Sequence, residues 1–218
     1  MAQPTGVFVT FSAKGLREDL ENVIYDISPT DTPFMSMGGR EDAVAVNHEW
    51  QTDSLADAAN NHHEEGVTLA AAEPTATSRL GNICQISLKT TLVSGTLDAV
   101  SKAGRKEELA YQMSKRAKEL KRDMERAYVG VNQAKTAMAA DTTVRKLGSL
   151  TSWVATNVSA GSGGSGAGNG AARTDGTART FTEALLKASI LSAFDEGADI
   201  KYLMMAPSQK QTFSSFVG

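Results

Sequence analysis

The sequence contains one cluster of side chains that could bind a metal, His62-His63-Glu64-Glu65. Imidazole nitrogens and carboxylate oxygens are common zinc ligands, so a metal-dependent enzyme centred on His62 and His63 is one hypothesis. Adjacent residues, however, point to different sides of a helix or a strand, and the i, i+4 histidine spacing of a zinc-binding helix is missing. We therefore favour a solvated loop tip and expect neither a metal site nor a cofactor.

The glycine-rich stretch 161–170 could be taken for a phosphate cradle. It lacks the closing Gly-Lys-Ser/Thr of a P-loop and fits no junction between a strand and a helix, so we interpret 159–170 as a flexible surface loop. The single cysteine, Cys84, excludes an internal disulfide and a cysteine-based zinc cluster. The sequence offers no Gly-x-Ser-x-Gly element and no recognisable pair of nucleophile and base, so we do not expect an enzyme.

The composition excludes several further classes of protein. A formal net charge of −3 provides no global basic field to hold nucleic acid. No apolar run approaches the length of a membrane-spanning helix, and the N-terminus lacks the basic and apolar regions of a signal peptide. We therefore expect a protein of cytoplasmic origin that has no membrane partner.

One long helix, predicted over 104–138, dominates the elements that could position a site. Its apolar side chains recur at steps of three and four, which places them on one stripe. Oppositely charged neighbours on the helix surface, such as Lys115 with Glu119 and Lys121 with Glu125, support it locally. The helix would be about 50 Å long, whereas a compact globule of this chain length is about 45 Å across. We therefore expect a flat or elongated subunit, a shape typical of assemblies.

The same helix leaves an alternative function open, that of a nucleic-acid-binding protein. Its basic residues could contact phosphates, but Glu107, Asp123 and Glu125 are interleaved with them, so the surface is mixed rather than positive. We favour a salt-bridged helix surface. The basic residues concerned are Arg105, Lys106, Lys115, Arg116, Lys118, Lys121, Arg122 and Arg126.

Two predicted strands precede the helix, at 44–52 and 82–91, because both segments alternate apolar and polar side chains. The connection between them is rich in alanine, asparagine, histidine and glutamate and is far too long for a tight turn. It is either a disordered insertion or a projecting hairpin that a neighbouring molecule orders. We favour the hairpin, since the connection can bury very little on itself.

The first part of the chain reads as an arm. Residues 1–35 are rich in apolar side chains, with one or two helical turns predicted over 16–27. Pro29 and Pro33 prevent a continuous helix, because the residue before a proline is pushed out of the α region. Such an arm must lie on something else to be ordered.

The last part of the chain predicts a helix, a strand and a second helix. Thr180 or Thr182 can cap a helix that Gly197 stops. A short apolar strand follows at 201–206, and Pro207 then sits where a helix over 208–217 would start. The strand needs sheet partners, of which the remaining sequence offers few.

Several long strings, in the same order as these elements, resemble one branch of the tailed-bacteriophage major capsid proteins, the head proteins of the Hong Kong ninety-seven fold. The resemblance covers nearly all of the chain. The strings are GLREDLENVIYDISPTDTPF (15–34), HEWQTDSL (48–55), NICQISLKTTLVSGT (82–96), AGRKEELAYQMSKRAKELKRDMERA (103–127), RTFTEALL (179–186) and MAPSQKQTFSSF (205–216).

The resemblance implies an α+β capsid-type fold with four parts. These are an N-terminal arm at 1–43, an extended loop formed by a long β-hairpin at 44–95, a peripheral domain at 96–178 with the spine helix 104–138 and the glycine-rich loop, and an α/β axial domain that begins at 179–218. Family members continue well beyond this point, so we expect the axial domain to be incomplete and part of the product to be missing.

The resemblance also implies a structural function, that of a subunit that self-assembles into the icosahedral head shell around phage double-stranded DNA. Such a protein is assembled in the host cytoplasm and resides in the virion. The expected partners are further copies of the chain in hexamers and pentamers, portal, scaffold or decoration proteins, and packaged DNA through weak non-specific contacts.

Two sets of apolar residues are predicted to serve this function. The candidates for subunit interfaces are Phe11, Leu16, Leu20, Ile24, Phe34 and Trp50. The predicted core residues of the spine helix are Leu109, Met113, Leu120 and Met124.

Overall fold

The computed structural model describes residues 14, 21–68, 71 and 73–216. The chain divides into two compact units. The first consists of Met1–Asp31 and Leu88–Leu120, and the second consists of Thr32–Ser87 and Lys121–Gly218. The described elements mix helices and strands, as the predicted α+β class requires. The predicted division into four parts remains a proposal.

The first unit holds α2 (Gly95–Ala99) and most of α3 (Glu108–Glu125). Ser94 is the N-cap residue of helix α2, and its side chain accepts a hydrogen bond from Leu97 N. Residues 21–27 form no helical turn, so the helix predicted over 16–27 is not present in its described part. The prolines that follow, Pro29 and Pro33, account in part for the extended backbone.

The long helix is shorter than predicted. Helix α3 ends at Glu125 and continues only as one π-helical turn, η1 (Arg126–Gly130), after which Val131 is extended with φ −136° and ψ 152°. At the other end, Gly104 has a φ of +76°, outside the right-handed helical region, and the helix starts four residues later. The predicted range 104–138 was therefore wrong at both ends.

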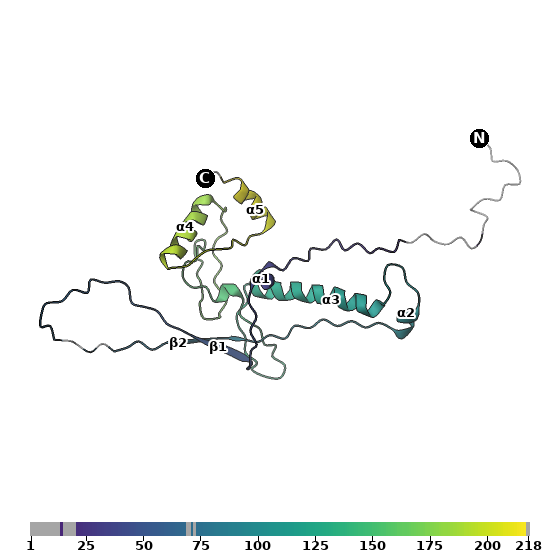
Figure 1. Cartoon of the computed structure of the whole chain (residues 1–218), viewed down its shortest axis with the longest axis horizontal. Coiled ribbons are helices and arrows are strands. Elements are labelled where there is room, and N and C mark those ends of the chain that lie inside the picture. Colours follow the sequence, from purple (N-terminus) through teal and green to yellow (C-terminus); the bar gives the residue numbers. More distant parts are fainter. Residues whose placement is uncertain (1–13, 15–20, 69–70, 72, 217–218) are drawn as a thin grey trace. The chain divides into compact units, whose positions relative to one another are not determined.

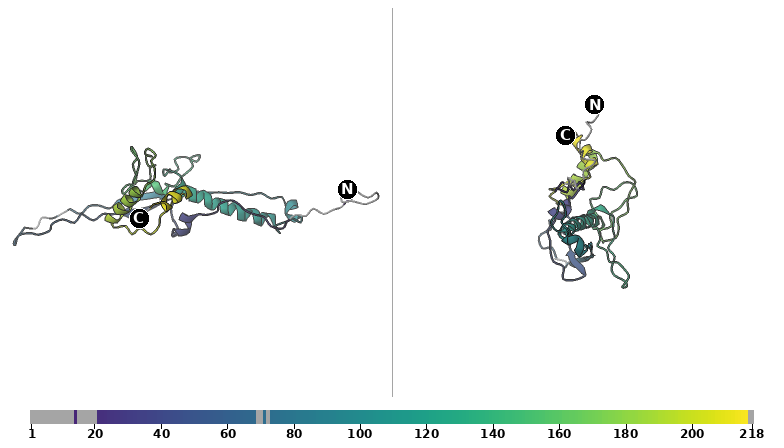
Figure 2. Two further views of the ribbon diagram at one scale, coloured as in Figure 1. Left: turned by 90° about the horizontal axis from the view of Figure 1, so that it is seen from above. Right: turned by 90° about the vertical axis from the view of Figure 1, so that its right-hand side faces the viewer.

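The second unit contains the hairpin. Strands β1 (Asn47–Thr52) and β2 (Ser78–Ile83) pair antiparallel, with Trp50 opposite Leu80. The two arms of the connecting loop extend away from the strand pair, as Figure 1 and the turned views of Figure 2 show. Every described residue from 53 to 77 is exposed. The hairpin was therefore predicted correctly as a motif.

The bounds of the two strands differ from the prediction. The first strand begins at Asn47 rather than at residue 44, and the second lies at 78–83 rather than 82–91. The alternating pattern after Ile83 belongs to an extended segment in which the Gln85 side chain accepts from Leu147 N at 3.3 Å. Periodicity detected the extended backbone but could not tell which residues have a strand partner.

The remaining helices of this unit are α1 (Pro33–Met37), α4 (Glu183–Asp195) and α5 (Pro207–Ser214), together with a 3₁₀ turn, η2 (Leu150–Ser152). Thr182 caps α4 by accepting from Leu185 N, and Gly197 follows its end with a φ of +81°, both as predicted. Helix α5 has Pro207 at its first turn, also as predicted. The stretch 201–206 is not part of a sheet among the described residues, so the strand predicted there was wrong.

The glycine-rich stretch is packed, which contradicts the flexible surface loop predicted for 159–170. Gly161 and Gly176 lie so close that a Cβ added to Gly176 would meet Gly161 O at 2.4 Å. A Cβ on Gly166 would meet Val154 O at the same distance of 2.4 Å. Close approach of backbone to backbone explains glycine at these positions, whereas Gly163, Gly168 and Gly170 have positive φ values that glycine adopts without steric cost.

Candidate assembly surfaces

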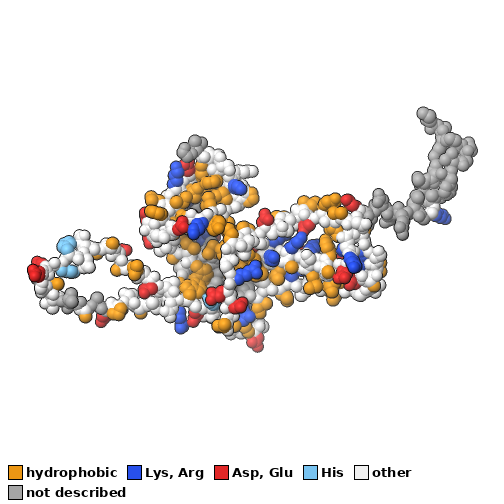
Figure 3. Space-filling view, in the orientation of Figure 1, with side chains coloured by type: hydrophobic (Ala, Val, Ile, Leu, Met, Phe, Trp, Pro, Cys, Tyr) orange, Lys and Arg blue, Asp and Glu red, His pale blue; other side chains and the backbone are white. Residues whose placement is uncertain are grey.

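The His62-His63-Glu64-Glu65 cluster lies in the exposed loop of the hairpin, where histidine and acidic side chains are visible at the far end in Figure 3. His63 Nε2 lies 2.9 Å from Asn61 Oδ1, a contact between loop neighbours. In the part of the chain that the structure describes, no three His, Cys, Asp or Glu side chains are placed to hold a metal ion together.

The base of the hairpin, in contrast, is held by side chains from several elements. Trp50 on β1 packs edge-on against Trp153, with ring centroids 4.9 Å apart and an interplanar angle of 63°. Lys135 Nζ donates to Gly81 O on β2 at 3.0 Å and lies 5.3 Å from the centre of the Trp153 ring. The strands of the hairpin are thus held by other elements, whereas its connecting loop is exposed.

Two acidic residues of helix α3 have hydrogen-bond partners within the chain, one on α3 itself and one on α1. Arg116 Nη1 donates to Glu119 at 2.6 Å, and both oxygens of Glu125 accept backbone N–H groups of α1, from Phe34 at 2.8 Å and Met35 at 2.9 Å. The pairs predicted from the sequence, Lys115 with Glu119 and Lys121 with Glu125, are thus replaced by other partners. Glu125 in effect caps the first turn of α1, where backbone N–H groups lack helical acceptors.

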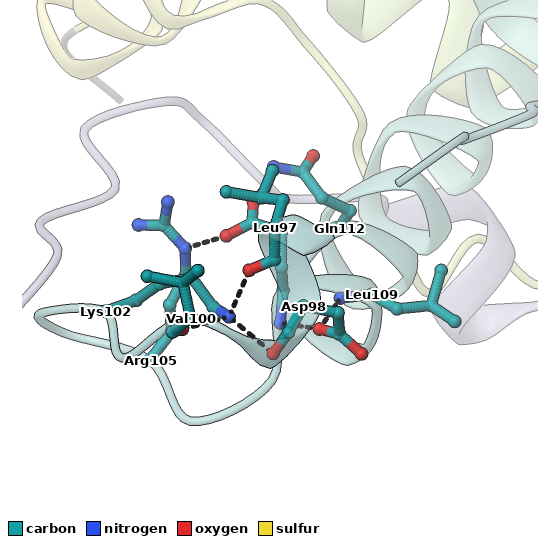
Figure 4. Close-up of polar contacts among 8 residues, drawn as sticks. Leu97, Asp98, Val100, Lys102, Arg105, Leu109 and Gln112 are labelled. Atoms are coloured by element: carbon teal, nitrogen blue, oxygen red, sulfur yellow. Dashed lines mark hydrogen bonds and ion pairs between the residues drawn. The ribbon is translucent and has the colours of Figure 1, made fainter. Parts of the chain in front are cut away.

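A polar network joins α2 to the start of α3 within the first unit (Figure 4). Lys102 Nζ donates to the carbonyls of Leu97, Asp98 and Val100 at 2.7, 2.9 and 2.9 Å. These carbonyls lie at the end of α2, where a cation is favourable. The Asp98 side chain accepts from the backbone N–H of Glu108 at 2.8 Å and so caps α3.

Glu108 completes this network as a buried charged residue, with 4% of its surface exposed. Hydrogen bonds from the Gln112 amide and the Arg105 guanidinium lower the pKa of Glu108, although its burial opposes them. A hydrogen bond from Arg116 likewise lowers the pKa of Glu119. The sequence analysis missed Asp98, Lys102 and Glu108. A serine at residue 94 is a signal for a helix start and could have revealed α2. Asp98, the residue of α2 that caps α3, would then have been a candidate.

The predicted interface residues fall into two groups. Phe11, Leu16 and Leu20 lie outside the described residues. The other three lie in contacts within the chain: Ile24 is next to Gly104, the Phe34 ring is 5.8 Å from the ring of Tyr128, and Trp50 packs on Trp153. Near Ile24, Asp26 pairs with Lys118 at 3.6 Å. Their role between subunits remains a proposal.

The predicted core residues of α3 line a surface rather than a core in this chain. Leu109 and Met113 are 44% and 59% exposed, and Leu120 and Met124 are partly exposed. Within the first unit, Leu109, Met113 and Leu120 border an open groove of about 370 Å³ that Lys89 and Thr91 complete. Periodicity identified the apolar stripe, but whether a stripe is covered depends on partners that periodicity does not report.

Exposed apolar side chains are widespread. Among the described residues, Ala127 is the sole hydrophobic residue that is buried, at 9% exposure. Ile86, Leu88 and Leu92 on the extended segment after β2 are 70%, 76% and 98% exposed. Leu191 and Phe194 on α4 are 60% and 72% exposed, and hydrophobic side chains gather on the visible face over α4 and α5 (Figure 3). A folded monomer ordinarily buries such side chains.

The described helices do not include one that is long and apolar enough to cross a membrane. The exposed apolar surface is spread over helices and extended segments instead, and it carries charged residues among its apolar ones. Exposed apolar surface of this extent, together with the projecting hairpin, is typical of proteins that associate with other protein surfaces.

Comparison with known proteins identifies the kind of assembly. A family model described as SU10 major capsid protein matches residues 3–218. The chain therefore belongs to the SU10 major capsid protein family. The major capsid protein of Escherichia phage Phieco32 is 40% identical over 142 residues, which cover 65% of this chain and 40% of that protein. The match thus spans well under two thirds of the relative.

The predicted family, that of the phage major capsid proteins, is confirmed by this membership.

Proposed function

We propose that this chain belongs to a subunit that self-assembles into the closed icosahedral head around phage double-stranded DNA, with the fold of the Hong Kong ninety-seven type. The arm, extended loop, peripheral domain and axial domain correspond in this proposal to 1–43, 44–95, 96–178 and 179–218. Copies of the subunit form hexamers and pentamers. Cofactors and catalysis have no part in this function.

The observation that carries the proposal is the lack of a core in a single chain. Ala127 is the one buried hydrophobic residue among those described, and the described residues leave many other apolar side chains exposed. Each large apolar side chain that becomes buried contributes about 1.5–3 kcal/mol before ordering costs. Association with other protein surfaces is therefore the physical route by which this sequence becomes stable, and symmetric copies are its most direct source.

The charges favour one contact between copies. The loop from 53 to 77 carries acidic side chains and neither lysine nor arginine, so it is anionic. At the end of α3 and in η1, Lys121, Arg122 and Arg126 are exposed, with Asp123 among them, while Glu125 is engaged with α1. We infer that the loop of one copy lies against this basic surface of another, where opposite charges fix the register.

The predicted interface residues keep a role in the proposal. Phe34 and Trp50 act indirectly, because they hold α1 and the hairpin base in place. Ile24 lies next to Gly104 within the first unit, and in this proposal the arm reaches a boundary between subunits. Leu109, Met113, Leu120 and Met124 are covered in the assembled shell.

Portal, scaffold or decoration proteins are further proposed partners, and packaged DNA is contacted weakly and without sequence preference. The alternative function, nucleic-acid binding through the long helix, predicts a different salt dependence. A protein that neutralises several phosphates loses affinity steeply as salt rises. Because Glu119 and Asp26 neutralise basic side chains of α3, we expect weak binding. A tight, sequence-dependent complex at physiological salt would support the alternative instead.

The test of the proposed function is expression of the complete gene product that contains this chain, followed by sedimentation and negative-stain microscopy. We expect closed shells of uniform size that contain no enzyme activity. A product that remains monomeric at high concentration, with no particles in the micrographs, would contradict the proposal.

A further inference from the structure

We propose that Lys135 and Trp153 are positioning residues that set the direction in which the hairpin leaves its unit, so that its loop reaches a neighbouring copy at a defined place. This inference rests on the proposed function, since direction matters only if a neighbour receives the loop. The fixed hairpin base and the open loop described above are the observations that lead to it.

Trp153 is the centre of the anchor because it touches three partners at once. Its indole N–H donates to Gly148 O at 3.2 Å, its ring forms a T-shaped pair with Trp50 on β1, and Lys135 lies over its ring. An edge-to-face pair of aromatic rings and a cation above an indole each favour one geometry over others. These contacts therefore orient the strand as well as attach it.

Lys135 ties the second strand to the same ring. Its ammonium donates to Gly81 O, an acceptor on β2, while the side chain covers Trp153. Both strands are thus fixed to one indole, β1 through Trp50 and β2 through Lys135. A hairpin held on both strands resists rotation about either one.

Asn82 adds a second point of attachment next to the first. Its side-chain Oδ1 accepts from Gly148 N at 2.7 Å, and its Nδ2 donates to Gly148 O at 3.2 Å. This two-way bond grips the backbone of Gly148, which also accepts from the Trp153 indole. Two attachments that share a residue leave the hairpin base little freedom to swing.

Two glycines make room for this arrangement. A Cβ on Gly170, whose φ is +87°, would lie 2.6 Å from Lys135 Cδ and 2.8 Å from Trp153 Cη2. A Cβ on Gly148 would lie 3.2 Å from Trp153 Cζ2. The glycine-rich stretch therefore ends in a residue that supports the anchor, which gives this packed segment a role in placing the hairpin.

The length of the loop makes the direction of its base important. Each arm of the loop can reach at most about 40 Å, and a rotation of about 10° at the base would move the far end by about 7 Å. A displacement of this size would move an acidic side chain of the loop out of reach of a lysine or arginine on its neighbour, because hydrogen-bonded ion pairs require contact distances.

The test begins with the subunit. Trp50 and Trp153 are the two tryptophans of this chain, and closely spaced indoles produce an exciton couplet in circular dichroism. Either Trp50→Phe or Trp153→Phe, made in the complete product, removes the couplet of this pair. The signal lost in both variants is therefore the couplet to be followed. We expect Lys135→Met to lose this couplet while the helical signal is unchanged, and Lys135→Arg, which keeps the cation and a donor, to retain it. The matched control is Lys210→Met, an exposed lysine on α5.

The second measurement is particle size by electron microscopy. Wild type, Lys135→Arg and Lys210→Met are expected to give uniform closed shells, whereas Lys135→Met gives open or irregular ones. If Lys135→Met does not fold, Lys135→Gln replaces it, since glutamine keeps a polar end without the cation.

Three results would overturn the inference. A couplet that survives in Lys135→Met shows that Lys135 does not orient the pair. Uniform shells from a variant that has lost the couplet show that the anchor does not direct assembly. Absence of shells from the wild type, with its couplet intact, contradicts the proposed function itself and removes the basis of the inference with it.

Discussion

The hairpin loop at 53–77 and the glycine-rich stretch at 159–170 are both rich in small side chains, yet the structure treats them in opposite ways. Every described residue of the hairpin loop is exposed, whereas backbone and side chains approach the glycines of the second stretch closely enough to exclude a Cβ at several positions. Gly170 at its end is buried, and its N–H donates to Ser152 O at 3.1 Å.

The difference lies in what small residues permit. Alanine in the hairpin loop offers little surface to bury and no special backbone freedom, so the loop finds no partner in its own chain. Glycine lets one backbone pack directly on another, and the hydrogen bonds of that contact then hold it. A composition rich in small side chains thus predicts neither exposure nor packing by itself. In the shell that we propose, the packed stretch supports the subunit and the open loop contacts a neighbour.

The strongest way to break this comparison is to add one methyl group to the packed stretch. In Gly161→Ala the new Cβ would lie 2.0 Å from Thr177 O, so the backbone must move. We expect a loss of about 3 kcal/mol or more in the free energy of unfolding, because such overpacking cannot be relieved by a side-chain rotation. Chemical denaturation of the complete product measures the change.

The matched control lies two residues away. Gly163 has a φ of +78° but nothing within 4 Å of an added Cβ. Gly163→Ala should therefore cost only the strain of a left-handed backbone, about 1–2 kcal/mol. If the two variants lose the same stability, the stretch is not packed and the flexible loop predicted from the sequence is correct.

An acid titration separates paired carboxylates of the folded part from those of the hairpin loop. Hydrogen bonds from Gln112 and Arg105 lower the pKa of Glu108 below the ordinary value of 4.5. A carboxylate with a lowered pKa contributes stability above its unfolded pKa and loses it as the pH falls through its folded pKa. We expect the midpoint of unfolding to drop as the pH falls below about 4.5, and less so in Glu108→Gln.

Glu64→Gln is the control for this titration, because Glu64 lies in the exposed loop. It should leave the dependence of stability on pH as it is in the wild type. An acid sensitivity that Glu108→Gln does not reduce would show that the network between α2 and α3 does not stabilise the start of α3.

The smallest effect on subunit stability is expected in the hairpin loop itself. Changing Glu64 and Glu65 together to glutamine should alter the free energy of unfolding by less than about 0.5 kcal/mol, as exposed substitutions usually do. The same change should slow assembly and weaken its dependence on salt, since two charges that attract the neighbour are gone. Light scattering at several salt concentrations follows both. Unchanged assembly would argue against a charged contact at the loop.

The sequence predicted more of the fold than of the surfaces. Thr182 and Gly197 bound α4 as expected, because capping and chain reversal are local and depend on a few neighbouring residues. The long helix was overextended, because its charged and apolar pattern continues while Gly130 and Val131 end it. Its apolar stripe was identified, but Leu109 and Met113 are exposed, since cover depends on other surfaces.

The anchor of the hairpin illustrates a second limit. Trp50 was a candidate because a large aromatic side chain stands on a predicted strand, but its partner Trp153 is far away in the sequence. Asn82, Gly148 and Gly170 have no pattern that marks them individually. Contacts between distant segments require the fold, so sequence reasoning could nominate one member of the anchor and not the arrangement.

Hydrogen exchange of the hairpin loop tests the central claim most directly, that the loop is open in one subunit and covered in the shell. The amides from 53 to 77 would be measured by mass spectrometry in free subunits and in purified particles, with the amides of β1 and β2 as the internal reference. We predict fast exchange of the loop in the subunit and strong protection in the particle. Protection already in the free subunit, or equally fast exchange in closed shells, would contradict the account.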